Sequence, residues 1–458
     1  MAYTHGGDIY GDAAVELDFS VNTNRLGMPE AVRDAVIASA AAWEQYPDAI
    51  CRKLRRAAAV FYEADGTPIP EDWLVFGNGA SDILYAVVAA VHPKQAILLA
   101  PGFSEYEQAL RMCGCEIRWL HLKEENGFSL ESVKEELYAM LRDGSRDASK
   151  TVSPEKNVKM ESVSIESAEE HTQKNEIQEG FPFKHENAWE KMLILGNPNN
   201  PTGRAISDDE MEELAEVCRE THTWLMVDEC FQWFLDARKE KSLVRKMSKD
   251  IFFHDIPFKQ KNKQENVNVS MQSIGSGIRR KHEEKEISPN WAHVILLNAL
   301  TKICSMAGLR LGYGIIPNAG LRERLEKFRQ PWSVSAPAQA GGVAAFAELA
   351  DHSGGNLLEW TDEFLQAERP WLAEKLEELG FTVYPSQTNY LLYRSPDEDS
   401  RDYKQACLED GILIRACENF EGLDRHYYRV AVRNRGENER LVNILKKVQS
   451  GEKHNVNL

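Results

Sequence analysis

The chain has 458 residues, of which 43% are hydrophobic and 28% are charged, as in a soluble globular protein with two or three domains. A formal net charge of −18 argues against nucleic acid or an anionic membrane surface as a general partner, although a few arginines can still hold a small anion. The opening residues, MAYTHGGDIYGD, have neither the basic nor the apolar segment of a signal peptide, and no apolar run is long enough to span a bilayer.

Eight cysteines are scattered along the chain without a CxxC pair. Cys113 and Cys115 alternate within a strand-like run and are expected to face the same side, but two ligands do not make a zinc site. We therefore predict no metal site and expect reduced core thiols in a cytoplasmic protein.

The N-terminal residues 1–30 are polar and punctuated by glycine, so they are expected to be irregular. Helices are predicted at residues 29–42, opening at a proline, and at residues 50–64, which carry an amphipathic pattern. We assign residues 1–48 to an arm and helix that join a smaller domain and a dimer interface.

From residue 73 onward, short apolar runs are followed by helical patterns. Strands are predicted at residues 74–76, 96–100, 116–122, 192–195, 224–227 and 294–297, with a helix at 83–91 after the glycine turn GNGASD. This alternation predicts an α/β fold in which helices cover both faces of a mostly parallel sheet. Ligands of such sheets bind beyond the carboxyl ends of the strands.

Two polar segments interrupt this pattern, at about residues 144–187 and 259–290. Both are rich in Lys, Glu, Ser, Asn and Gln, so we interpret them as solvated insertions in a large domain of residues 49–318. Beyond it, residues 319–458 are predicted to form a smaller α+β domain. Its predicted helices are 319–328, 336–350 and 360–380, and its predicted strands are 382–384, 390–393, 412–414 and 428–432.

Lys302 follows the strand-like run 294–297 at the point where a strand end meets a loop. A lysine beside apolar sequence is usually a surface residue whose stem packs against the protein. The alternative is a desolvated amine with a lowered pKa that attacks an aldehyde, as in a Schiff-base enzyme. The choice depends on whether the chain supplies partners for pyridoxal phosphate.

Each demand of pyridoxal phosphate has a candidate that follows a predicted strand. Its phosphate needs hydrogen-bond donors at the start of a helix, and its ring needs a flat neighbour. Its pyridine nitrogen needs an anion, and its phenolate oxygen needs a hydrogen-bond donor. Taken singly, each candidate is more often an ordinary turn or helix cap, but together they favour a cofactor site. In the same order, the candidates are Gly79, Ala80 and Ser81; Phe103; Asp228; and Asn200.

The motifs GNGAS, PGFSEY, NPNNPTG, VDECF and LTKICSMAGLRLGYG resemble those of fold-type I pyridoxal-phosphate enzymes in the class I/II aminotransferase superfamily. This resemblance implies a large domain with a mostly parallel seven-stranded sheet between helices and a smaller α+β C-terminal domain. HGGD at 5–8, DFSVNTNRLG at 18–27, YPD at 46–48 and residues 412–441 are most similar to the threonine-phosphate decarboxylases of cobalamin biosynthesis. Histidinol-phosphate aminotransferases are the near neighbour, and they usually have tyrosine at the position of Phe231.

The resemblance also implies roles for individual residues. Lys302 is expected to form the internal aldimine and to shuttle protons. Arg310, Ser81 and Thr301 are expected to hold the cofactor phosphate, and Tyr46 is expected to reach the phosphate of a partner subunit, which implies a homodimer. The expected substrate ligands are Arg429 for an acidic group, Arg415 with His5 for a phosphate, and Asn22.

Two residues depart from the family pattern. Ala299 stands where serine is usual, so one hydrogen bond to the cofactor phosphate is missing, a loss of roughly 1.5–3 kcal/mol unless another donor compensates. Arg25 stands where proline is usual, and we expect it to bring an extra cation near the substrate side.

We predict a cytoplasmic enzyme that decarboxylates L-threonine O-3-phosphate to (R)-1-aminopropan-2-yl phosphate. If the runs ILIR and YYRVAVR pair as strands, Arg415 and Arg429 point into one pocket and hold a substrate with two anionic ends. An aminotransferase for a phosphorylated or acidic amino acid is the first alternative. The second alternative is a non-catalytic cofactor-binding sensor. It requires a DNA-binding module, and the net charge of −18 and the lack of an N-terminal helix-turn-helix pattern argue against it.

Overall fold

The computed structural model describes residues 6–11, 13–143, 189–235, 242–253, 290–351, 356–396 and 398–451. His5 and the predicted insertions, 144–187 and all of 259–290 except Asn290, lie outside these residues.

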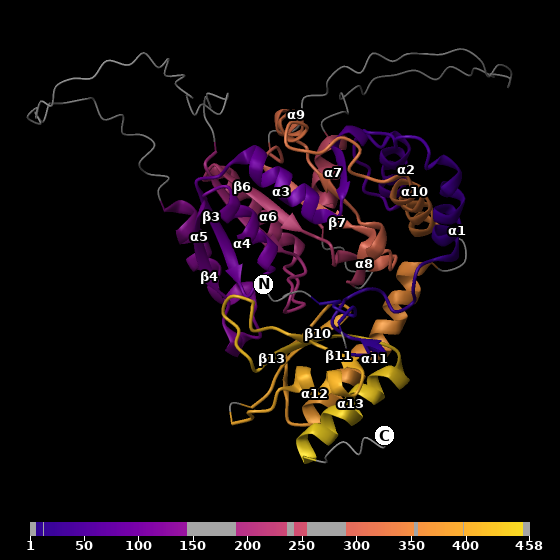
Figure 1. Ribbon diagram of the computed structural model, residues 1–458. Coiled ribbons are helices and arrows are strands. Elements are labelled where there is room, and N and C mark those ends of the chain that lie inside the picture. The colour runs from indigo at the N-terminus through magenta and orange to yellow at the C-terminus, as the bar shows by residue number, and fades with distance from the viewer. Residues whose placement is uncertain are drawn as a thin grey trace, which may run out of the picture.

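A seven-stranded sheet forms the centre of the larger part of the molecule, in the order β2-β8-β7-β6-β5-β3-β4 (Figure 1). The five strands from β7 to β4 are parallel to their neighbours, whereas β8 is antiparallel to both β7 and β2. The predicted mostly parallel, seven-stranded sheet is therefore confirmed. Its strands are β2 Leu74–Asn78, β3 Gln95–Ala100, β4 Glu116–His121, β5 Lys191–Gly196, β6 Thr223–Asp228, β7 Val294–Ala299 and β8 Leu311–Ile315.

Helices cover both faces of this sheet, and alternate strand residues pack against each face. On β5, Met192 and Ile194 join one core cluster with α3 and α4, whereas Leu193 and Leu195 join the other. The helices of the larger part are α1 Glu30–Ala38, α2 Arg52–Ala64, α3 Ala80–Val91, α4 Ser104–Met112, α5 Lys134–Arg142, α6 Asp208–Glu220, α7 Leu243–Phe253, α8 Leu300–Ile303, α9 Ala319–Leu325 and α10 Ala336–Ala350. Short 3₁₀ turns occur at Ser39–Ala42, Glu71–Trp73, Glu124–Asn126, Leu130–Val133, Gln232–Phe234 and Ala307–Leu309.

The C-terminal part contains a four-stranded sheet in the order β12-β13-β10-β9, packed with three helices (Figure 1). The N-terminal arm joins this part, because its short strand β1 pairs in parallel with β11. These elements are β1 Leu17–Asp18, α11 Leu357–Glu378, β9 Thr382–Val383, β10 Tyr390–Arg394, α12 Tyr403–Glu409, β11 Ile412–Leu413, β12 Arg415–Ala416, β13 Tyr427–Ala431 and α13 Arg435–Ser450.

The expectation for Cys113 and Cys115 is wrong. Cys113 ends α4 and Cys115 lies ahead of β4, with Gly114 between them in the left-handed region at φ 69°. The two residues thus belong to a helix-to-strand turn and do not alternate along a strand. All eight cysteines are free. Within the described residues, no cluster of three or more His, Cys, Asp or Glu side chains is arranged to hold a metal ion, and no helix is long and apolar enough to cross a membrane.

Candidate active site

Lys302 lies at the carboxyl edge of the central sheet, where three parallel strands end together. It belongs to α8, the single turn that follows β7 directly. In the sheet register Asp228, the last residue of β6, is opposite Leu297 of β7 and Gly196 of β5. The topology therefore brings the lysine, the aspartate and the loop after β5 to one place, as expected for an α/β sheet.

A pocket of about 290 Å³ opens at this edge of the sheet. Among the described residues that line it are twelve of the predicted site residues, contributed by both parts of the molecule. These are Asn22, Gly79, Ala80, Ser81, Phe103, Asn200, Asp228, Thr301, Lys302, Arg310, Arg415 and Arg429. Ala299 also lines the pocket, and it brings no hydroxyl group there.

The Lys302 amine lies in the pocket and is buried, which bears on the choice that the sequence left open. Burial, with the positive charges of Arg429 and Arg310, lowers its pKa from 10.5 to about 8. Its Nζ atom lies 5.9 Å from the centre of the Phe231 ring. About a tenth of this amine is therefore uncharged at pH 7, far more than of an ordinary lysine, and the uncharged form is the one that attacks a carbonyl carbon. The surface-lysine alternative is wrong.

Asp228 is held by one donor on each carboxylate oxygen. Tyr106 donates its hydroxyl to Oδ2 at 2.7 Å, and the backbone N–H of Cys230 donates to Oδ1 at 3.0 Å. Burial and the neighbouring carboxylate raise the pKa of Tyr106 well above its usual value, so Tyr106 remains a donor. These two donors fix the plane of the carboxylate. Each oxygen keeps a lone pair that can accept a further hydrogen bond.

The turn between β2 and α3 forms a cradle for an anion. Gly79 adopts φ 88° at the N-terminus of α3, and a Cβ atom there would lie 2.7 Å from Nη2 of Arg310. A Cβ atom on Gly312 of β8 would overlap the backbone nitrogen of Ala80. Glycine is thus required at both positions, because a helix N-terminus, an arginine and a strand approach one another too closely for side chains. Backbone N–H groups beside a guanidinium group suit a phosphate.

Phe103 and Asn200 complete the residues suited to pyridoxal phosphate. The Phe103 ring meets the Tyr106 ring edge-on at 5.6 Å. The side-chain oxygen of Asn200 accepts a hydrogen bond from Nη1 of Arg429, and its NH₂ group supplies the donor that a phenolate oxygen needs. Phosphate cradle, aromatic face, amine and carboxylate therefore occur together in one pocket, and this set of groups fits the cofactor.

Arg415 and Arg429 face one another across two paired strands. β12 and β13 are antiparallel, and their register places Arg415 directly opposite Arg429, with both side chains in the pocket. The predicted pairing of the two runs is therefore confirmed. Both residues are largely buried, at 9% and 6% exposure, and burial lowers the pKa of Arg429.

Polar partners orient each guanidinium group. Arg415 donates from Nη2 to the side chain of Asn419 at 2.6 Å. Arg429 donates from Nη2 to the carbonyl of Ser20 at 2.9 Å. With its amide oxygen turned toward Arg429, Asn22 accepts at 3.2 and 3.3 Å. Like charges placed opposite one another in a sheet repel, so this arrangement is suited to an anionic ligand.

One sequence expectation changes at the edge of the site, and a second, that Tyr46 reaches the cofactor of a partner subunit, stays a prediction. Arg25 was expected to bring a cation to the substrate side, but its guanidinium group pairs with Glu437 at 2.6 Å, and Arg25 does not line the pocket described above. The carboxylate of Glu437 on α13 draws the side chain away. Tyr46 is also absent from this pocket; its side chain is 81% exposed and packs on Trp332 with ring centres 4.7 Å apart.

Sequence reasoning missed Tyr106 and Asn419. Tyr106 lies three residues after Phe103 in the motif PGFSEY and in the first turn of α4, so its closeness to a candidate cofactor contact was a usable signal. Asn419 lies in the loop ENFEG after β12, and its contact with Arg415 depends on a loop conformation that no local pattern indicates.

A family model described as aminotransferase class I and II matches residues 14–445. A threonine-phosphate decarboxylase of Salmonella typhimurium is 29% identical over 456 residues, covering 98% of this chain and 97% of that protein. A histidinol-phosphate aminotransferase of Methanopyrus kandleri is 22% identical and covers 93% of this chain and 86% of that protein.

Solved structures share the fold. The histidinol-phosphate aminotransferase from Clostridium acetobutylicum matches with a TM-score of 0.66 at 20% identity, covering 95% of this chain and 99% of that one. The L-threonine-O-3-phosphate decarboxylase from Porphyromonas gingivalis matches with a TM-score of 0.63 at 18% identity and the same coverage. The predicted fold type is confirmed. The chain belongs to the aminotransferase class I and II family and is a pyridoxal-phosphate-dependent enzyme.

Proposed function

We propose that the protein decarboxylates L-threonine O-3-phosphate to (R)-1-aminopropan-2-yl phosphate. The observation that carries the proposal is the pair Arg415 and Arg429, opposite one another across β12 and β13 in the Lys302 pocket. Two buried guanidinium groups on one side of a pocket suit a substrate with two anionic groups. A substrate with one such group brings an anion to only one of the two guanidinium groups and so gains less binding free energy.

The relatives support the same substrate class. Proteins named threonine-phosphate decarboxylase are 29% and 27% identical to this chain over nearly its whole length. Relatives named histidinol-phosphate aminotransferase are 22–25% identical. Both names refer to a compound that carries an amine and a phosphate group. Threonine phosphate also carries a carboxylate, so each arginine would have an anionic group to bind.

Pyridoxal phosphate supplies an aldehyde for the substrate amine and a ring that takes up the electron pair released when a bond at Cα breaks. Lys302 supplies the buried amine that holds or delivers a proton beside the reacting carbon. Asp228, fixed by Tyr106, offers a carboxylate to the protonated ring nitrogen. Arg429 and Arg415 bind the anionic groups of the substrate and so determine which Cα bond is presented.

We further propose an arm at residues 1–48, a large domain at 49–318 and a small domain at 319–458. β1 of the arm pairs with β11 of the C-terminal part, and the first two helices after residue 318, α9 and α10, pack on α3 and on α1 and α2 of the larger part. A homodimer follows from the proposed role of Tyr46, which lies outside its own pocket. The eight scattered cysteines, all free, fit a reducing compartment such as the cytoplasm.

The test is product analysis with the cofactor-loaded protein. Threonine phosphate should release carbon dioxide, with kcat/KM at least about a hundredfold above that for threonine, or roughly 3 kcal/mol of transition-state binding. Arg415→Ala should abolish most of this preference while the visible spectrum of the cofactor stays unchanged. Arg401→Ala, which removes a surface arginine paired with Asp399, is the matched control and should retain the preference.

Two results would contradict the proposal. Equal rates with threonine and threonine phosphate would show that the arginine pair does not bind the phosphate group of the substrate. Release of a 2-oxo acid in place of carbon dioxide would assign the protein to transamination of a phosphorylated or acidic amino acid.

A further inference from the structure

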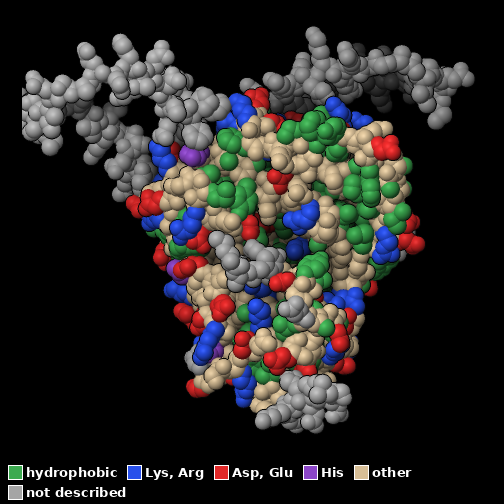
Figure 2. All heavy atoms as spheres, viewed as in Figure 1, with side chains coloured by type: hydrophobic (Ala, Val, Ile, Leu, Met, Phe, Trp, Pro, Cys, Tyr) green, Lys and Arg blue, Asp and Glu red, His purple; other side chains and the backbone are tan. Residues whose placement is uncertain are grey.

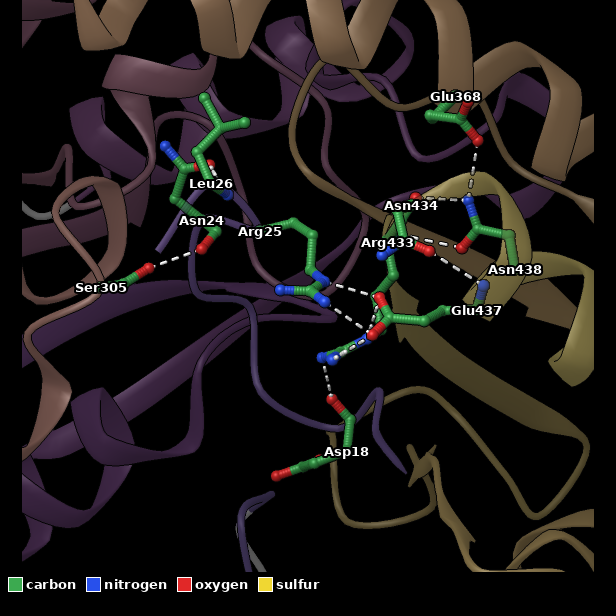
Figure 3. Close-up of polar contacts among 10 residues, drawn as sticks. All are labelled: Asp18, Asn24, Arg25, Leu26, Ser305, Glu368, Arg433, Asn434, Glu437 and Asn438. Atoms are coloured by element: carbon green, nitrogen blue, oxygen red, sulfur yellow. Dashed lines mark hydrogen bonds and ion pairs between the residues drawn. The ribbon is translucent and has the colours of Figure 1, made fainter. Parts of the chain in front are cut away.

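An ion pair fastens the N-terminal arm to the C-terminal part beside the active site (Figure 3). Arg25 donates from Nε and Nη2 to the two carboxylate oxygens of Glu437, at 2.6 and 2.7 Å. Arg433 donates to the same carboxylate and also to the carbonyl of Asp18 in the arm. Although burial alone would raise it, hydrogen bonds and charges from Arg25 and Arg433 lower the pKa of Glu437.

The residue before Arg25 is bound to the segment that carries the catalytic amine. The backbone N–H of Asn24 donates to the carbonyl of Lys302 at 2.9 Å, and its side-chain amide donates to the carbonyl of Ile303 at 3.0 Å. Ser305 donates its hydroxyl to the carbonyl of Asn24, the contact drawn in Figure 3. Asn24 is 4% exposed, so these bonds lie in a dry environment.

The same short stretch of the arm also reaches the substrate arginines. Asn22 accepts from Arg429, and its own carbonyl accepts from Asn389 at 3.0 Å. Asn22, Asn24 and Arg25 therefore contact, within four residues, the substrate pocket, the lysine segment and α13. A proline at position 25 would have no donor for Glu437.

We propose that Arg25 is a positioning residue: its ion pair with Glu437 holds the arm so that Asn24 fixes the Lys302 segment and Asn22 fixes Arg429. The position of the C-terminal part thereby determines where the arm places both the Lys302 segment and Arg429. This inference rests on the proposed roles of Lys302 and Arg429, and it adds a contact that touches neither the cofactor nor the substrate.

The test compares wild type with Arg25→Met, which keeps an unbranched stem of four heavy atoms and removes the charged guanidinium group. Three quantities are measured: in the cofactor-free protein, the pH midpoint for modification of the Lys302 amine by an amine-reactive reagent, followed by peptide mass spectrometry; and in the cofactor-loaded protein, KM and kcat for threonine phosphate. A loosened arm admits water to the Lys302 amine, which faces Arg310, Arg429, Asp228 and Cys230. Water relieves the desolvation that lowers its pKa, so the midpoint should rise by about 0.5 or more. KM should rise about tenfold, because Asn22 no longer orients Arg429.

Arg440→Met is the matched control. Arg440 on α13 pairs with Glu16, so it links the same arm to the same helix but does not contact Asn22 or Asn24. This variant should retain the wild-type midpoint and KM. Arg25→Lys, which keeps the charge but not the two-pronged hydrogen bond, should recover part of both effects. Glu437→Gln, which removes the charge from the other side, should shift the midpoint in the same direction, and it replaces Arg25→Met if that variant does not fold.

The inference is wrong if Arg25→Met lowers the melting temperature but keeps the midpoint and KM of the control. An equal shift in Arg440→Met would also overturn it, because the effect would then belong to the arm in general. If wild type binds the cofactor but does not turn over threonine phosphate, the proposed function fails, and the midpoint comparison still decides the role of Arg25.

Discussion

At the scale of single residues, the pocket concentrates positive charge in a protein of net charge −18. The charged side chains that line it, within the described residues, are Lys302, Arg310, Arg415, Arg429 and the single carboxylate Asp228. Burying several cations costs free energy unless anions pair with them. If the proposed function holds, the cofactor phosphate and an anionic substrate bring anions to these groups, and binding is expected to lower the repulsion among them.

This repulsion predicts that Lys302 destabilises the cofactor-free protein. Because burial lowers its pKa from 10.5 to about 8, the unfolded chain binds more protons than the folded protein between these values. Stability should therefore rise with pH from about 8 to 10.5, and below pH 8 the buried ammonium costs roughly 3 kcal/mol. Cofactor-free Lys302→Met should melt at a higher temperature than wild type at pH 7.

The pH dependence of that gain distinguishes the mechanism. The gain should shrink as the pH approaches 10.5, because the wild-type amine is then neutral in both states. Lys53→Met, at an exposed position on α2, should change the melting temperature little at any pH. A gain that is constant from pH 7 to pH 10.5 would show that the methionine stabilises by packing and not by removing a charge.

Asp228→Asn should cut turnover at least about a hundredfold, because a neutral amide no longer favours a protonated ring nitrogen. The fold should persist, because one of the two donors keeps its acceptor whichever way the amide turns. The amide oxygen faces either the Tyr106 hydroxyl or the Cys230 N–H. Circular dichroism and steady-state kinetics check both statements, with Asp399→Asn as a control distant from the pocket. Wild-type turnover in Asp228→Asn would refute the role given to the carboxylate.

At the scale of elements, short apolar runs predicted strands, both the buried ones and the partly exposed edge strand β4. All six predicted strands of the central sheet are present, with ends displaced by at most two residues. The seventh, β8, was missed because its sequence LGYGI carries two glycines and so lacks the usual strand pattern. The structure gives the reason for Gly312, which packs against the turn that opens α3.

The site was predictable to the extent that its residues follow strands. Asp228 ends β6, and Lys302 and Asn200 follow β7 and β5 within four residues. A parallel sheet brings such positions together at one edge. The partner of Arg25 was not predictable, because Glu437 is far away in sequence and the contact depends on how the arm crosses the C-terminal part. Local patterns contain no information on such long-range pairs.

Gly312→Ala tests the close approach of β8 to the cofactor cradle. The added methyl group would overlap the Ala80 nitrogen and lie 2.5 Å from the carbonyl carbon of Gly79, so the turn must shift. Affinity for pyridoxal phosphate should fall at least about tenfold, since the N–H groups of the turn move away from the phosphate. Titration of the cofactor-free protein measures this change.

Gly308→Ala is the matched control, because a Cβ atom there meets no atom within 4 Å. It should bind the cofactor as wild type does. If both variants bind equally well, the approach of β8 does not shape the cradle.

At the scale of the whole molecule, one face carries exposed apolar side chains around the turn that follows α1. Ile37, Trp43 and Tyr46 are 65%, 59% and 81% exposed, and Trp332 lies beside them against Tyr46. Hydrophobic side chains also gather over α1, α2 and α10 in Figure 2. Exposed aromatic side chains of this size are typical of a surface that another protein covers, and we expect a second copy of the chain to cover this one.

Mixed dimers test whether that second copy completes the active site. Lys302→Ala removes the amine, and Tyr46→Phe removes the hydroxyl that is expected to reach the cofactor phosphate of the partner. Each variant alone has two defective sites per dimer. If Tyr46 acts across the interface, a dimer of one copy of each contains one site with Lys302 from one protomer and Tyr46 from the other, both intact. Co-expressed variants should therefore be more active, and bind cofactor more tightly at that site, than either variant by itself.

The size of the gain is set by statistics. Random pairing makes about half of the dimers mixed, each with one wild-type site, so activity should approach about a quarter of the wild-type value per protomer when each single variant is nearly inactive. Light scattering checks that the mixture is dimeric, and separate tags isolate the mixed species. A pair of Lys302→Ala and Asp228→Asn is the control, because both residues lie in the same pocket of one chain and mixing cannot restore them. Equal activity in the two mixtures would place the action of Tyr46 within its own protomer and remove the case for shared sites.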